Sequence, residues 1–318
     1  MESRRLQQAC LVLCILLAGL LPINNAQAIE FYPLPPAGEH LIGEVIEDYV
    51  QPGDNLTTIA RRNSVGHIEL QKANPGINFN RLKPQQKIII PNHYVLPNAK
   101  REGIVVNLSE MRLYYFPPNE NLVITAPISI GKEGWETPVA TTTIIDKVAD
   151  PSWRVPKSIR AASAAKGRRL PEIVPPGPKN PLGQYALRLN MNSLLIHGTN
   201  NPRSIGKQVS SGCIRLYPQD IETLFYDVPT GTPVQIVNEP YKLGWSNGKL
   251  YLEAHEPVEN NNEIAAIIDY QSLVRQANYH IGAPIDWHKV EIIAKQEQGI
   301  PTNIIEPQPE LPQDSGFY

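Results

Sequence analysis

Cysteine is scarce in this sequence, and most of it lies near the N-terminus. Of three cysteines in 318 residues, Cys10 and Cys14 fall in the first apolar run and leave Cys213 alone. Beyond residue 28 there is no long apolar run and no basic stretch typical of nucleic-acid binding, and the formal charge is −2. Aromatic residues are only 7% of the chain, whereas proline occurs 31 times. These features argue against a helical bundle, a nucleic-acid partner and a membrane span beyond the N-terminus.

The N-terminus has the pattern of a secretory signal. Arg4 and Arg5 precede an apolar run from Ala9 to Ile23, and Ala26-Gln27-Ala28 offers small residues at the spacing that a signal peptidase needs. A transmembrane anchor is the alternative, but the run is short for a bilayer and a cleavage site follows it. The sequence therefore predicts a signal peptide over residues 1–28. It also predicts an exported protein that spans no membrane after processing and is periplasmic where the cell has an outer membrane.

Cys213 would then be the only thiol of the exported protein. Thiols in an oxidising compartment are normally paired, so an unpaired one is either a buried small hydrophobe or a reactive group. The cysteine count alone weighs these two interpretations equally, and the residues around Cys213 have to separate them.

The exported chain divides into five segments. We expect an irregular leader over residues 29–46, a compact unit over 47–92 and a large β-rich segment over 101–237. A C-terminal subdomain over 238–300 and a proline-rich, disordered tail over 301–318 follow.

The C-terminal subdomain is predicted to combine a hairpin with two helices. Asn247-Gly248 is a strong tight-turn signal between alternating apolar residues. Helical patterns cover 263–278 and 286–298, the second with Asp286 as N-cap and Gly299 as the stop. The sequence does not show whether these helices cover the large segment or contact a partner.

The compact unit is predicted to be a small β-α-α-β fold. A first strand ends in the turn Pro52-Gly53-Asp54, Leu56 and Ile59 lie on one face of a first helix, and a closing strand runs from Lys87 to Ile90. Over its full length the unit resembles a LysM domain, through its Gly-Asp-x-Leu, Ile-Ala, Asn-Pro and terminal Ile-x-Ile-Pro features.

The LysM resemblance implies binding of polymers that contain N-acetylglucosamine, and peptidoglycan is the natural ligand for an exported bacterial protein. The implied groove lies between the strand–helix loop and the helix–strand loop. Its candidate residues are Gly53, Asp54, Asn55, Asn74 and Pro75. The alternative is a unit that serves only folding.

The large segment carries the candidate chemistry. His197 ends an apolar strand pattern, and Ser210-Ser211-Gly212-Cys213-Ile214-Arg215 follows after a loop that can return to the same place. An imidazole can take the proton of a thiol, and a guanidinium can favour the thiolate or hold a substrate carboxylate. A structural histidine, a plain turn and a solvated arginine are the alternative interpretations.

This segment resembles the catalytic domain of the L,D-transpeptidases, a YkuD-type β-sandwich, over about 101–237. His197, Gly198, Ser210, Gly212, Cys213 and Arg215 match its signature, and Ile128 to Gly131, Thr137-Pro138 and Asn180 to Gly183 agree upstream. Two residues depart from the family pattern. Ser211 stands where many members have histidine, and Ala140 replaces the glycine of the Thr-Pro-x-Gly turn.

The resemblance implies that Cys213 attacks the bond between a diamino acid and the terminal D-Ala of a peptidoglycan stem. His197 would act as general acid and base, the Gly198 carbonyl would orient it, and the Gly212 backbone would help to bind the oxyanion. Substrate contacts are predicted for Arg215, Ser210, Ser211 and Trp153, and no metal or other cofactor is predicted.

The acyl acceptor stays open. A stem amine would give a 3→3 cross-link, a lysine of an envelope lipoprotein would give an anchor, a free D-amino acid would give exchange, and water would make a carboxypeptidase. A wall-binding protein without activity is the remaining alternative. The insertion between Asp150 and Gly183, with Trp153 and a basic run at 166–169, is a candidate lid, although Trp153 could equally anchor a local core. The sequence does not predict the oligomeric state.

Overall fold

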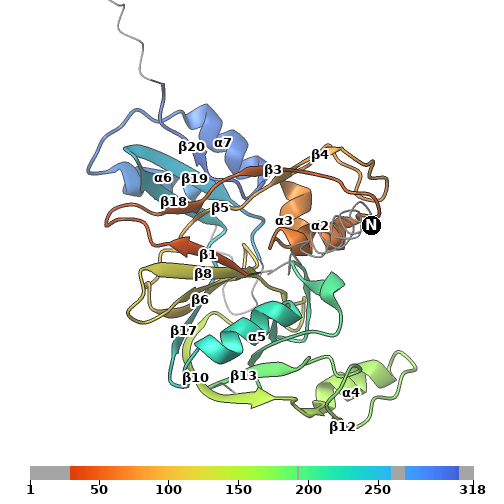
Figure 1. The fold of residues 1–318 in the computed structure, drawn as a ribbon. Coiled ribbons are helices and arrows are strands. Elements are labelled where there is room, and N and C mark those ends of the chain that lie inside the picture. The colour runs from red at the N-terminus through yellow and green to blue at the C-terminus, as the bar shows by residue number, and fades with distance from the viewer. Residues whose placement is uncertain (1–28, 192, 259–268, 308–318) are drawn as a thin grey trace, which may run out of the picture.

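The computed structural model describes residues 29–191, 193–258 and 269–307 (Figure 1). The predicted signal peptide over 1–28 lies outside the described residues. Among the residues that are described, no helix is both long and apolar enough to cross a membrane.

A nine-stranded sheet forms the centre of the molecule, and the mostly β fold class is confirmed. Its strands, in spatial order, are β1 (Glu30–Pro33), β8 (Leu122–Pro127), β7 (Arg112–Phe116), β6 (Gly103–Asn107), β17 (Pro233–Val237), β10 (Ala140–Ala149), β13 (Tyr185–Leu189), β14 (Leu195–His197) and β16 (Ile214–Arg215).

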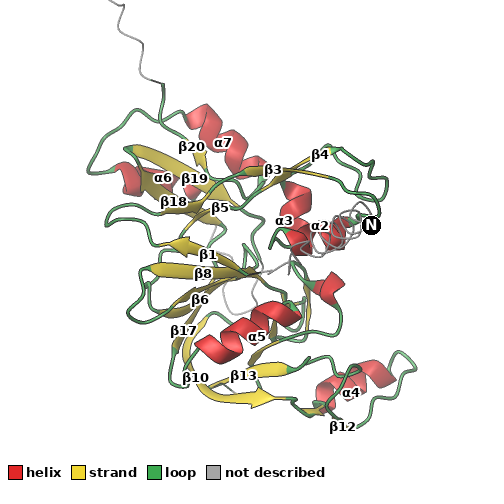
Figure 2. Cartoon of the chain, in the orientation of Figure 1, coloured by secondary structure: helices red, strands yellow, loops and turns green. Residues whose placement is uncertain are grey.

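The long strand β10 bends this sheet. Its first half pairs with β17 and its second half with β13, and the register shifts between Ile144 and Asp146. Such a bulge adds local twist, so the sheet curls around one apolar core instead of lying flat. Helix α5 (Pro218–Asp227) packs on β13 and closes that core with Ile221 and Leu224 (Figure 2).

The hairpin of β6 and β7 is buried on both faces. Ile104 and Leu113 face the main core, whereas Val105 and Tyr114 face a second cluster that also contains Ile42. Because successive side chains of a strand point to opposite faces, both clusters need apolar residues throughout these strands.

The leader is not irregular, so that prediction was wrong. Its strand β1 pairs with β8 at the edge of the large sheet, and β2 (Leu41–Gly43) pairs with β5 (His93–Val95). Tyr32 and Ile42 pack into the second cluster. The leader therefore covers strand edges and apolar surface that would otherwise meet water.

The compact unit has the predicted β-α-α-β order, in β3 (Ile46–Tyr49), α2 (Leu56–Arg62), α3 (His67–Lys72) and β4 (Lys87–Ile90). Asn55 caps α2 by accepting hydrogen bonds from the backbone of Thr57 and Thr58. Ile59 and Leu70 are fully buried in its small core.

The C-terminal hairpin is confirmed as β18 (Tyr241–Ser246) and β19 (Lys249–Ala254), joined by Asn247 and Gly248 at positive φ. Helices α6 (Tyr270–Asn278) and α7 (Trp287–Gln296) follow, and residues 259–268 lie outside the described part.

Two predictions about this end of the chain were wrong. Helix α7 stops at Glu297, which takes the left-handed conformation in place of Gly299. Residues 301–307 of the predicted tail are ordered, because β20 (Thr302–Asn303) pairs with β19 and Ile304 is fully buried. Residues 308–318 lie outside the described part.

A buried ionic network ties this subdomain to the hairpin of β6 and β7. The ammonium of Lys242 lies 2.8 Å from Glu110 and 2.9 Å from Glu253, and it donates to the Val95 carbonyl at 2.7 Å. Glu110, Glu253 and His255 are close enough together to surround a cation, and Lys242 already supplies the positive charge there. Burial alone would lower the pKa of Lys242. The two carboxylates raise this pKa by more than burial lowers it, so Lys242 stays charged and both ion pairs are kept.

Replacing Lys242 by Met should destabilise the protein by about 3–5 kcal/mol, because two buried carboxylates lose their counter-charge. The matched control is Lys295→Met, which removes an exposed pair with Glu291 and should change the stability far less. Urea unfolding of the exported chain measures both. Equal, small effects would contradict the role given to the buried network.

Candidate active site

The pairing of β14 with β16 brings His197 and Cys213 to one face of the sheet. These strands run parallel, with Ile196 opposite Ile214 and His197 opposite Arg215. Both isoleucines point into the core, so His197 and Arg215 point to the other face. Cys213 directly precedes β16 and shares that face by the same alternation.

The backbone fixes the tautomer of His197. Its Nδ1 atom lies 2.6 Å from the carbonyl oxygen of Gly198. A carbonyl only accepts, so Nδ1 carries the proton and Nε2 keeps its lone pair. The orienting contact expected from Gly198 is present.

The imidazole is neutral at rest. His197 is buried, and burial followed by the charge of Arg215 lowers its pKa to about 4, against the effect of hydrogen bonds to the backbone of Gly198 and Leu182. Nε2 is therefore free to accept a proton at neutral pH.

The thiol is also neutral at rest. Burial raises the pKa of Cys213, whereas the backbone at Leu195 and the charge of Arg215 lower it less. The thiol donates to the Ser193 carbonyl at 3.4 Å, and a hydrogen bond to His197 is not among its contacts in the described part of the chain. At rest, a neutral thiol and a neutral imidazole therefore share one face of the sheet.

The backbone on both sides of Cys213 is tightly held. Gly212 has φ +101°, which L side chains rarely adopt, and its carbonyl accepts a hydrogen bond from Thr137 Oγ1 at 2.7 Å. Thr137 Oγ1 also accepts from the Gly131 backbone N–H. The sequence placed Thr137 only within a family pattern and gave it no role, because contacts between distant segments leave no local signal.

Ser210 supports the nucleophile from the other side. It is fully buried, and its hydroxyl donates to the Cys213 carbonyl. This contact makes Ser210 a positioning residue. Its predicted contact with substrate stays a prediction, as does that of the partly exposed Ser211.

Arg215 lies between the core and the surface. Its backbone pairs with Ser129, and its side-chain Nε is buried with no hydrogen-bond partner recorded among the described residues. Burial lowers its pKa and the nearby Cys213 raises it. A buried guanidinium with an unused donor is suited to a carboxylate, and that contact stays a prediction.

A depression of about 480 Å³ lies at the turn after β13. It is lined by residues 188–191 and 193–195 together with Ile145. Ser193, whose carbonyl accepts from Cys213, belongs to this lining, whereas Cys213 itself does not.

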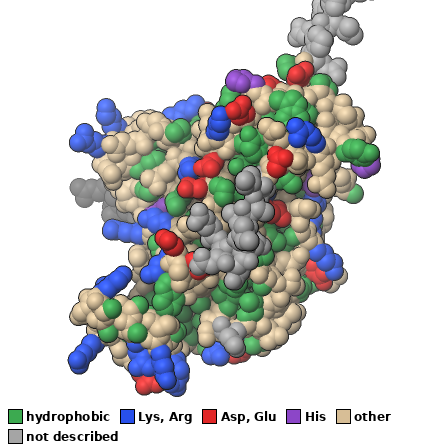
Figure 3. Space-filling model, turned by 180° about the vertical axis from the view of Figure 1, so that it is seen from behind, with side chains coloured by type: hydrophobic (Ala, Val, Ile, Leu, Met, Phe, Trp, Pro, Cys, Tyr) green, Lys and Arg blue, Asp and Glu red, His purple; other side chains and the backbone are tan. Residues whose placement is uncertain are grey.

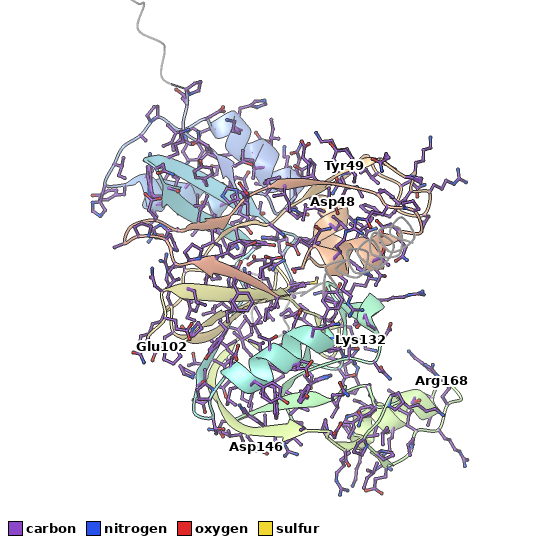
Figure 4. All side chains as sticks on the ribbon, in the orientation of Figure 1. Asp48, Tyr49, Glu102, Lys132, Asp146 and Arg168 are labelled. Carbon is purple, nitrogen blue, oxygen red and sulfur yellow. The ribbon has the colours of Figure 1, made fainter. Side chains whose placement is uncertain are left out.

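The insertion after β10 forms a separate lobe with β11 (Trp153–Arg154), α4 (Lys157–Ala164) and β12 (Ile173–Val174). Trp153 is half-buried beside Val174, so its substrate contact stays a prediction. Seen from behind, Lys and Arg side chains gather on this lobe (Figure 3), and Arg168 lies at its outer end (Figure 4).

Three of the residues predicted to contact glycan use their polar side chains in contacts inside the compact unit. Asp54 pairs with Arg62 at 3.0 Å, and the Asn55 side chain caps α2. The Asn74 amide is buried and bonds to the backbone of Leu70 and Ile89. Gly53 and Pro75 are exposed at the two loops. Glycan contact at all five stays a prediction.

Comparisons with known proteins agree with both resemblances. Residues 101–236 match the L,D-transpeptidase catalytic domain, called YkuD, and residues 49–91 match the LysM domain. The chain is 44% identical to the probable L,D-transpeptidase YcfS of Escherichia coli K12, over 71% of this chain and 73% of that one. It is 37% identical to the probable L,D-transpeptidase ErfK/SrfK of Salmonella typhimurium, over 88% and 93%.

The arrangement predicts how the imidazole titrates. In an NMR titration of the exported chain, the His197 ring should protonate at a pKa of about 4. Arg215→Gln should raise that pKa, because one of the two causes that lower it is removed. Arg168→Gln, an exposed arginine on the separate lobe, should leave it unchanged. A His197 pKa that is the same in Arg215→Gln as in the unaltered chain would contradict this arrangement.

Proposed function

The chain belongs to the L,D-transpeptidase family, and we propose that it cuts peptidoglycan stem peptides with Cys213 and passes the acyl group to an amine. The observation that supports this mechanism best is the tautomer of His197, which the Gly198 carbonyl fixes and which leaves Nε2 unprotonated on the sheet face that it shares with Cys213.

Acylation begins when Cys213 Sγ attacks the carbonyl of the diamino acid that precedes D-Ala, while His197 Nε2 takes the thiol proton. The tetrahedral intermediate collapses, the C–N bond breaks, and His197 returns the proton to the leaving D-Ala amine. A thioester on Cys213 remains. In the second half, the incoming amine attacks the thioester carbonyl while His197 takes its proton. The C–S bond then breaks, and His197 returns the proton to the Cys213 sulfur.

The oxyanion is bound by backbone N–H groups. Because the peptide bond is planar and trans, the Cys213 N–H points opposite to the Gly212 carbonyl, which Thr137 fixes. This places a preorganised donor next to the nucleophile. Losing a donor of this kind typically costs about 3–4 kcal/mol of transition-state stabilisation.

The LysM unit suggests that the substrate is the wall itself. We propose that it binds peptidoglycan glycan strands and that the chain works as an exported, periplasmic enzyme after removal of residues 1–28. The acceptor is a stem amine, giving a 3→3 cross-link, or a lysine of an envelope lipoprotein.

The function is tested by incubating the exported chain with a purified disaccharide tetrapeptide and reading the products by mass spectrometry. A dimer plus free D-Ala is expected, and Cys213→Ala should abolish both. A lysine-terminated lipoprotein peptide in the same mixture tests the second acceptor. Tripeptide without dimer would mean hydrolysis, and no turnover by the unaltered chain would leave only wall binding.

The rate of acylation should fall on the acid side with a midpoint of about pH 4, because below its pKa His197 is already protonated and cannot take the thiol proton. D-Ala release at substrate concentrations well below KM measures this, because kcat/KM reports the pKa values of the free enzyme, and far-UV circular dichroism at each pH is the control for folding. A midpoint at about pH 6.5, where an ordinary histidine titrates, would contradict a buried neutral base.

A further inference from the structure

The LysM unit is packed directly against the loop that joins His197 to Cys213. The first turn of α3 lies beside the segment between β14 and α5 (Figure 1). The backbone N–H groups of His67 and Ile68 donate to the carbonyls of Ile205 and Gly206 at 3.3 and 3.4 Å. The first N–H groups of a helix have no partner inside it, so here the catalytic loop supplies their acceptors.

Two glycines allow this close approach. A Cβ added to Gly206, which has φ +76°, would lie 2.3 Å from the His67 nitrogen, and one added to Gly66 would lie 2.9 Å from the Gly206 Cα. Neither position has room for a side chain unless helix and loop move apart.

A buried ion pair holds the same interface. Arg112 on β7 is fully buried, and its Nη2 lies 2.8 and 2.9 Å from the two carboxylate oxygens of Glu69 on α3. The same nitrogen donates to the Ser64 carbonyl, and the guanidinium stacks over Tyr94 at 4.1 Å. Glu69 also accepts from the Gly66 backbone N–H at 2.8 Å, which ties the ion pair to the glycine contact.

The far side of the loop is fixed to the catalytic sheet. Gly206 N–H donates to the Ile128 carbonyl, and Ile130 N–H donates to the Lys207 carbonyl. The neighbouring Ser129 pairs with the backbone of Arg215, two residues after Cys213. A continuous set of backbone contacts therefore leads from α3 through Gly206 to the nucleophile.

We propose that the LysM unit positions the active-site loop, with Glu69 and Gly66 acting through Gly206 as positioning residues for Cys213. The unit is then part of the catalytic framework as well as a binding module. This inference rests on the proposed role of Cys213.

A substrate without sugar distinguishes a positioning role of the LysM unit from simple tethering to glycan. A tether alters only the use of glycan-containing substrate, whereas a positioning unit alters turnover of any stem peptide. With a free tetrapeptide as donor, Glu69→Gln should lower kcat about ten- to a hundredfold, the cost typical of small misplacements. The KM for that peptide should stay within about twofold, because Glu69 makes no contact that would bind the substrate in its ground state.

Gly66→Ala is the second variant, because Glu69→Gln leaves the buried Arg112 without its counter-charge and can fail to fold. It keeps every charge and only pushes α3 away from Gly206, so it should lower kcat in the same direction. The matched control is Glu47→Gln in the same unit, an exposed glutamate paired with Lys87, which should leave kcat unchanged. Thermal melting shows that each variant is folded.

Amide hydrogen exchange supplies a readout that needs no turnover. In both variants, the Gly206 and Ile130 amides should exchange about tenfold faster, while a core amide such as Val106 keeps its rate. Faster exchange with lower kcat supports the inference. Unchanged loop exchange in the folded variants would overturn it. If the unaltered chain releases no D-Ala, the proposed function fails, and the exchange result alone decides the positioning role.

Discussion

The parallel pairing of β14 with β16 is the constraint on which the active site depends. Two short strands put His197 and Cys213, the proposed base and nucleophile, on one face of the sheet although they are sixteen residues apart. The core residues Ile196 and Ile214 keep this register, because a shift by one residue would turn His197 and Cys213 into the core. The chemistry is therefore fixed by apolar packing beneath it. The Gly198 carbonyl and Thr137 then set the direction of the reacting groups.

Buried charge joins the parts of the chain around this sheet. Lys242 connects the C-terminal hairpin to Glu110, and Arg112 connects the LysM helix α3 to β7. Such pairs cost desolvation energy and add little net stability, but breaking one leaves an uncompensated charge. They therefore favour one arrangement of the parts over others. A LysM unit held in this way would present any glycan that it binds at a fixed distance from Cys213.

Most local structure could be predicted from the sequence, and the missing parts are those that depend on distant partners. The strand and helix patterns of the LysM unit and the Asn247-Gly248 turn carry their own signals. The leader strand β1 is only four residues long and ends in Pro33, and it forms because the edge of β8 is open to it. Likewise β20 forms only against β19. Neither partner is visible from the segment itself.

The residues of the candidate site could likewise be predicted only where the signal is local in the sequence. His197, Gly198 and Cys213 could be found because they lie in one compact pattern, whereas Thr137, Arg112 and Glu69 act across 43 residues or more. The Ser210 hydroxyl was predicted to contact substrate from its place in the motif, and the fold adds a hydrogen bond from it to the Cys213 backbone that the motif does not indicate. A residue type near a nucleophile predicts membership of the site, but only packing shows which atom it faces.

The central claim is that Cys213 carries the acyl group, and the most direct measurement is the intact mass of the exported chain mixed rapidly with a stem tetrapeptide. The account predicts an added mass equal to the tetrapeptide without its terminal D-Ala and without one water, located by fragmentation on the peptide that contains Cys213. D-Ala release by the Cys213→Ala protein, or an adduct on another residue, would contradict it.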